Sequence, residues 1–180
     1  MMVRSVVLSV HIVGMLTLFI GLALEWLSLE SLRRANTSAQ GLPWVRVLRG
    51  LPRYIAMAVG LIVVSGIYLA VRVGVFNFGW VRVSFGAMVL MGLLGGPIVR
   101  SRMRVLLAPG DDREGTSGTL RHHAWHPLLF VSLHMRAAVA LAIVYLMIAK
   151  LDLRESLLLI GLALVLGAAT SVLAWRAQPS

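Results

Sequence analysis

Four ionisable side chains lie within long apolar runs of the sequence: His11, Glu25, His134 and Arg136. An ionisable group inside a membrane is costly, so such residues are candidates for functional sites. An imidazole can ligate haem iron or a transition-metal ion, and a carboxylate with a guanidinium can form a buried ion pair. These four residues therefore carry most of the chemistry that the apolar part of the chain offers.

The first apolar run places two of these residues on one face. Glu25 follows His11 by fourteen positions, which is an angular separation of only about 40° around a helix axis. Gly14, Leu18 and Gly21 lie on the same stripe. Because lipid penalises polar groups and small residues favour close helix packing, we expect this stripe to face the interior of a helical bundle.

His134 and Arg136 are two residues apart, so on a helix they point about 160° away from each other. They cannot both point into one pocket. We expect Arg136 either to extend toward the cytoplasmic surface or to reach Glu25, because each charge needs a partner. The second alternative predicts an ion pair between the first and fourth apolar runs.

His11 and His134 are candidate ligands of one haem b, since facing histidines in a helical bundle suit haem iron. Their expected depths differ by roughly 13 Å along the membrane normal at 1.5 Å per residue. Axial ligands of one iron lie at similar depth. The alternative is that each histidine is a hydrogen-bonded residue of the bundle.

A second candidate site is the histidine cluster before the fourth apolar run. His123 and His126 can share a helical face and offer two ligands to a copper-type or zinc-type ion, with His122 or water completing the shell. The alternative is that these histidines contact lipid headgroups. No serine or threonine lies in a recognisable nucleophile elbow, so we expect no catalytic nucleophile.

The elements that must position these residues are apolar helices. The chain has 180 residues, of which 59% are hydrophobic and 13% charged, and its mean hydropathy is +0.88. A helix needs roughly 20 apolar residues to cross the bilayer, and backbone hydrogen bonding excludes open sheets there. We therefore predict an all-α integral membrane protein, a single domain over residues 1–180, with about five transmembrane helices at approximately 5–28, 54–75, 80–99, 127–149 and 156–175.

The arginines and lysines predict the orientation. Five of them fall on one side of the predicted spans, whereas eleven fall on the other side, which the positive-inside rule makes cytoplasmic. This places the N-terminus outside and the C-terminus in the cytoplasm of a multi-pass protein of the bacterial inner membrane. The basic side faces anionic lipid headgroups, and this placement of charge argues against a nucleic-acid partner.

Two segments between and within the spans carry further predictions. Residues 44–52 mix apolar and basic side chains, which favours a short helix on the membrane surface. Small residues at a spacing of four, including Gly92 with Gly96 and the series Ala163, Gly167 and Ser171, favour close packing of helices. Packing within one bundle is the simpler interpretation, and a dimer interface is the alternative.

The residues of the first run, HIVGMLTLFIG at 11–21, resemble the opening helix of small bacterial membrane proteins related to the copper-resistance-D group. The segments LHMR at 133–136 and LMIAKLDLRESL at 146–157 are similar to the closing helix pair of a related family of unknown function. This resemblance implies a fold and a location more than an activity. The opening helix is also weakly similar to that of the bacterial membrane protoporphyrinogen oxidase, whose first-helix histidine corresponds to His11.

These observations favour a non-enzymatic polytopic inner-membrane protein that handles a metal or haem through its intramembrane histidines. The alternatives are a haem b-dependent membrane redox enzyme and a structural or accessory subunit of a larger membrane complex. The expected cofactors are haem b or a copper-type or zinc-type ion. The expected partners are the bilayer and, because of the glycine-lined helix faces, other copies of the chain or other subunits.

Overall fold

The computed structural model describes residues 2–35, 37–106 and 127–176. Over these residues the chain forms five helices, which confirms the prediction of an all-α fold. In chain order they are α1 (Met2–Arg34), α2 (Ser38–Val73), α3 (Gly79–Leu106), α5 (Pro127–Ala149) and α6 (Leu153–Arg176).

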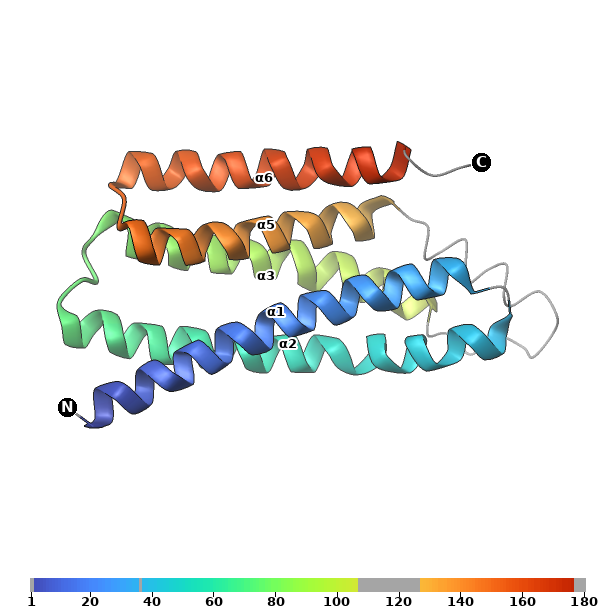
Figure 1. The fold of residues 1–180 in the computed structure, drawn as a ribbon, viewed down its shortest axis with the longest axis horizontal. Coiled ribbons are helices and arrows are strands. Elements are labelled where there is room, and N and C mark those ends of the chain that lie inside the picture. The colour runs from blue at the N-terminus through green and yellow to red at the C-terminus, as the bar shows by residue number, and fades with distance from the viewer. Residues whose placement is uncertain (1, 36, 107–126, 177–180) are drawn as a thin grey trace.

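The helices run along a common direction, with α1 crossing the others obliquely, and their chain directions alternate (Figure 1). The most extensive contacts join α1 to α2 and α5 to α6, while α3 packs mainly against α5. Helix α1 begins and α6 ends at opposite ends of the bundle. This alternation places Arg4, Arg72, Arg82, Lys150 and Arg154 near one end, as the predicted division of the charges requires.

Four helices are long and apolar enough to cross a membrane: α1, α2, α5 and α6. Helix α3 is apolar over the shorter stretch Gly79–Gly95. Length and composition therefore fit a multi-pass membrane protein, and the fifth crossing stays a prediction.

Helix α2 begins well before the predicted span at 54–75. It starts after Thr37, whose hydroxyl oxygen accepts a hydrogen bond from the Gln40 backbone N–H at 3.4 Å. The helix continues through Pro43 and Pro52, so the expectation of a separate surface helix at 44–52 is wrong. The physical reason is that apolar residues keep a helical spacing through this segment, which buries Leu48 and Leu51 in the same apolar core as residues of α1.

The small residues at a spacing of four have two different surroundings. Ala163, Gly167 and Ser171 are buried on α6, and a Cβ atom at Gly167 would lie 2.7 Å from the Cα atom of Met135. This series therefore packs α6 closely against α5, as the interpretation of packing within one bundle predicts. Gly92 differs, because a Cβ atom there would meet no atom within 4 Å.

Candidate functional site

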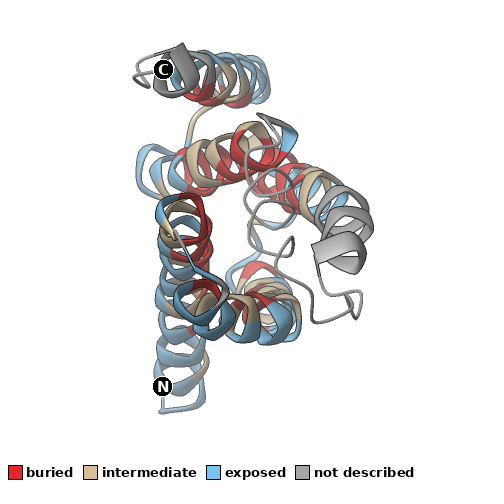
Figure 2. Ribbon diagram, turned by 90° about the vertical axis from the view of Figure 1, so that its right-hand side faces the viewer, coloured by how far each residue is buried: buried red, intermediate tan, exposed pale blue. Residues whose placement is uncertain are grey.

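The polar stripe of α1 faces the interior of the bundle. His11, Gly14, Leu18, Gly21 and Glu25 are all buried, while most of the residues between them are exposed. Figure 2 shows buried residues on the inward faces of the helices and exposed residues on the outside. The prediction made from helical periodicity is therefore confirmed for every residue of the stripe.

The imidazole of His11 is held by α2. Its Nδ1 atom lies 3.1 Å from the Ile62 carbonyl oxygen and 2.9 Å from the Ser65 hydroxyl oxygen. A carbonyl oxygen only accepts hydrogen bonds, so Nδ1 carries the proton and Nε2 of a neutral ring carries a lone pair. The Ser65 hydroxyl donates to the Leu61 carbonyl oxygen, so it is free to accept from His11. This arrangement fixes both the tautomer and the direction of the ring.

His11 lines a cavity of about 370 Å³ that we call the histidine cavity. Two cations, Arg4 and Lys150, also line it, and both are exposed. The hydroxyl of Ser84, another lining residue, is buried and has no hydrogen-bond partner among the described residues. Most of the remaining wall is apolar and comes from four helices and the turn after α2: Leu8, Ile62, Val63, Gly66, Leu69, Ala70, Val73, Val75, Trp80, Val81, Phe85, Met88, Ile143 and Met147.

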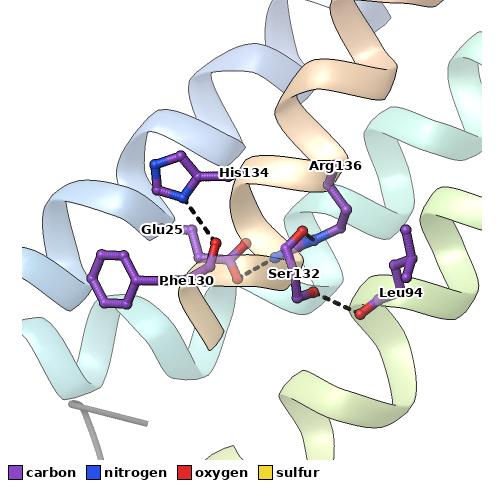
Figure 3. A network of polar contacts seen from close by, with 6 residues as sticks. All are labelled: Glu25, Leu94, Phe130, Ser132, His134 and Arg136. Carbon is purple, nitrogen blue, oxygen red and sulfur yellow. Dashed lines mark hydrogen bonds and ion pairs between the residues drawn. The ribbon is translucent and has the colours of Figure 1, made fainter. Parts of the chain in front are cut away.

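Glu25 and Arg136 form a buried ion pair between α1 and α5. The Arg136 Nη2 atom donates to the Glu25 carboxylate at 2.5 Å, and the two side chains are 5% and 3% exposed. The Nε–H of Arg136 also donates to the Ser132 carbonyl oxygen at 3.3 Å, and the Ser132 hydroxyl donates to the Leu94 carbonyl oxygen of α3 at 2.7 Å (Figure 3). The predicted contact between the two opposite charges is confirmed.

This pair lines a second cavity, of about 310 Å³, that we call the ion-pair cavity. Its other lining residues are mostly apolar or small and come from α1, α2 and α3: Leu18, Leu22, Leu48, Leu51, Pro52, Ile55, Ala56, Val59, Met91, Gly92 and Gly95. Leu18 lines the ion-pair cavity and Ile62 and Met88 line the histidine cavity, and these three buried side chains pack in one apolar cluster. The polar groups of the α1 stripe therefore belong to two compartments rather than one.

His134 lies apart from both cavities. Its Nδ1 atom donates to the Phe130 carbonyl oxygen of its own helix at 2.8 Å, and the side chain is half-buried (Figure 3). Arg136, two residues away, points instead into the ion-pair cavity. This divergence is the one that the helical geometry predicts.

The structure does not bring His11 and His134 together. Glu25 lies fourteen residues beyond His11, about 21 Å along the axis of α1. Because Glu25 bonds Arg136, which is two residues from His134, the two histidines lie at different levels of the bundle. This separation gives no support to a haem ligated by both histidines.

His122, His123 and His126 lie outside the described residues, so the cluster stays a prediction. Within the described ranges, no three His, Cys, Asp or Glu side chains gather as a metal site would require.

Sequence reasoning missed the burial of Arg33, which it counted among the surface charges. Arg33 is 7% exposed, its guanidinium lies 4.2 Å from the centre of the Phe130 ring, and it pairs with Glu30 at 3.5 Å. Its position three residues after Glu30 and eight after Glu25 on a buried face is the signal that could have found it. The contact with Phe130 ties the end of α1 to the start of α5.

In comparisons with known proteins, no family model, curated protein or solved structure matches this chain. The resemblance to the copper-resistance-D group stays a prediction. The site must therefore be interpreted from its own geometry.

Proposed function

We propose that this chain is a non-enzymatic multi-pass protein of the bacterial inner membrane that holds haem b in the histidine cavity, with Nε2 of His11 as a ligand of the iron. The observation that carries the proposal is the hydrogen bond from His11 Nδ1 to the Ile62 carbonyl oxygen. It leaves Nε2 unprotonated, which is the form that binds a metal. The division of the basic residues supports an N-terminus outside and a C-terminus in the cytoplasm.

The residues of the cavity fit haem in their chemistry. The walls are mainly apolar, as the faces of a porphyrin require. Arg4 and Lys150 supply two cations for the two carboxylates that haem b carries. Within the described part of the chain no acidic residue lines the cavity, so no described side chain there opposes those carboxylates.

The protein's own part is to orient the ligand and to set its surroundings. The Ile62 carbonyl and Ser65 fix the imidazole, and an oriented second partner of this kind makes the ring a better ligand. Among the described residues, none lines both this cavity and the ion-pair cavity. When bound, haem supplies an iron centre whose electron-transfer or gas-binding properties depend on this environment.

A second candidate ligand is a copper(I) ion. The thioether-bearing residues Met88 and Met147 line the same cavity as His11. Thioether sulfur and imidazole nitrogen are ligands that suit copper(I). Elemental analysis of the purified protein distinguishes this candidate from haem.

The experiment is an absorption spectrum of the protein purified after expression with adequate haem. We expect a Soret band that disappears in His11→Ala and persists in His134→Ala, which is the matched control because His134 lines neither cavity. An equally strong band in His11→Ala would overturn His11 ligation. A spectrum without a Soret band, together with copper that His11→Ala loses, would favour the second candidate.

A further inference from the structure

The ion-pair cavity opens at the side of the bundle. Ala56 of α2 and Gly92 of α3 both line it, and both are exposed. A Cβ atom at Gly92 would meet no atom within 4 Å, so this part of the mouth is unobstructed. In a membrane-embedded bundle, an opening between two apolar helices faces lipid rather than water.

At the inner end of this cavity, the guanidinium of Arg136 has N–H donors that are not used in hydrogen bonds. A guanidinium has five N–H donors. Arg136 uses Nε–H on Ser132 and one Nη2 donor on Glu25, and among the described residues Nη1 has no hydrogen-bond partner. Gly95 leaves the space beside Nη1, because a Cβ atom there would lie 3.0 Å from it. These donors therefore remain available to an acceptor inside the cavity.

The rest of the lining is suited to a hydrocarbon chain. Between the mouth and the pair, the wall consists of side chains such as Ile55, Val59 and Met91. Among the described residues that line it, Glu25 is the only acidic one, and its carboxylate is already bonded to Arg136. A small inorganic anion would leave this apolar surface uncovered.

We propose that the ion-pair cavity binds an anionic amphiphile, a long-chain carboxylate or alkyl phosphate, which enters from the bilayer between α2 and α3. Its head accepts hydrogen bonds from Arg136, and its chain covers the apolar wall. The proposal rests on the membrane location proposed above but not on haem. A failed search for haem in His11 variants therefore leaves it intact, and its own failure leaves the haem proposal intact.

The test measures binding of radiolabelled oleate to the protein in nanodiscs of phosphatidylcholine, with empty nanodiscs subtracted. We expect saturable binding that dodecyl phosphate competes for and that oleyl alcohol, at equal concentration, does not. Arg136→Gln should weaken binding by about tenfold, a loss of about 1.4 kcal/mol, because it removes the charged donor of the hydrogen bonds to the head. Equal competition by oleyl alcohol, or unchanged binding in Arg136→Gln, would overturn the proposal.

Two glycine variants test entry without touching the ion pair. Gly92→Leu fills the mouth and should weaken oleate binding by about tenfold, a loss of about 1.4 kcal/mol. Gly60→Leu is the matched control, because Gly60 is also exposed on a helix and has open space at its Cβ position but lines neither cavity. Equal binding by the two variants would overturn entry at this mouth. Competition by inorganic phosphate at the concentration of dodecyl phosphate would overturn the requirement for a chain.

Discussion

The two cavities of the bundle differ in how each accommodates a polar side chain among apolar helices. In the histidine cavity, one ring nitrogen of His11 is bonded to a backbone carbonyl and the other keeps its lone pair. In the ion-pair cavity, Glu25 and Arg136 neutralise each other. A backbone partner leaves a neutral imidazole with a lone pair that can bind a metal, whereas a counter-charge neutralises Arg136 but leaves several of its N–H donors for a hydrogen-bond acceptor.

This difference predicts that the ion pair matters mainly for the stability of the protein and that His11 matters mainly for ligand binding. A buried charge that loses its partner costs several kcal/mol, while a neutral imidazole that is removed costs only its hydrogen bonds and packing. The ion pair should therefore contribute more to the cohesion of α1 and α5 than His11 contributes to that of α1 and α2. His11 should matter more for what the protein holds.

The largest expected effect comes from breaking the ion pair. Arg136→Ala leaves Glu25 buried without its counter-charge and should destabilise the folded protein by about 3–5 kcal/mol. His11→Ala removes hydrogen bonds of a neutral group and should cost about 1–2 kcal/mol. Thermal unfolding in detergent, followed by tryptophan fluorescence, compares the two variants directly.

The charge-reversed double variant, Glu25→Arg with Arg136→Glu, is the control for that comparison. It restores opposite charges between α1 and α5, so it should unfold at a higher temperature than either single reversal. If the double variant is no more stable than the single reversals, the attraction between the two charges does not stabilise the contact of α1 with α5.

The part of this site that helical periodicity governs could be predicted from the sequence. The 100° rotation per residue placed His11 and Glu25 on one buried face, and the need of each charge for a partner pointed to Arg136. The hydrogen-bond partners of His11 could not be predicted, because they depend on the register between α1 and α2. Nothing in the spacing of residues 61–66 shows that the Ile62 carbonyl and Ser65 meet His11.

The same limit explains the glycines and the start of α2. Gly92 and Gly167 both belong to series of small residues at a spacing of four, yet one borders an open mouth and the other contacts the backbone of α5. Sequence spacing does not show which face has a neighbour. The mix of apolar and basic side chains at residues 44–52 suggested a separate surface helix, but the buried face that contains Leu48 and Leu51 continues α2 through this segment.

A smaller effect on stability is expected from Gly95, which lies against the side chain of Arg136. In the ion-pair cavity, a Cβ atom at Gly95 would lie 3.0 Å from both Cδ and Nη1 of Arg136. Gly95→Ala should displace the guanidinium and destabilise the protein by about 1–2 kcal/mol, within the usual range for overpacking. Gly86→Ala, on the same helix with open space at its Cβ position, is the control and should not lower the unfolding temperature. Equal unfolding temperatures for the two variants would show that Arg136 has room to move.

The smallest expected effect on stability lies in the histidine cavity. A Cβ atom at Gly66 would lie 3.2 Å from Cε1 of His11, so Gly66→Ala should shift the ring by a few tenths of an ångström at a cost of about 0.5–1 kcal/mol. Because the ring would tilt away from the position that the Ile62 carbonyl fixes, haem retention through gel filtration should fall more than stability does. Gly60→Ala, with open space on the same helix, should retain haem as the parent does. Equal retention by both variants would mean that the direction of the imidazole does not control ligation, and the contrast between the two cavities would then rest on the ion pair alone.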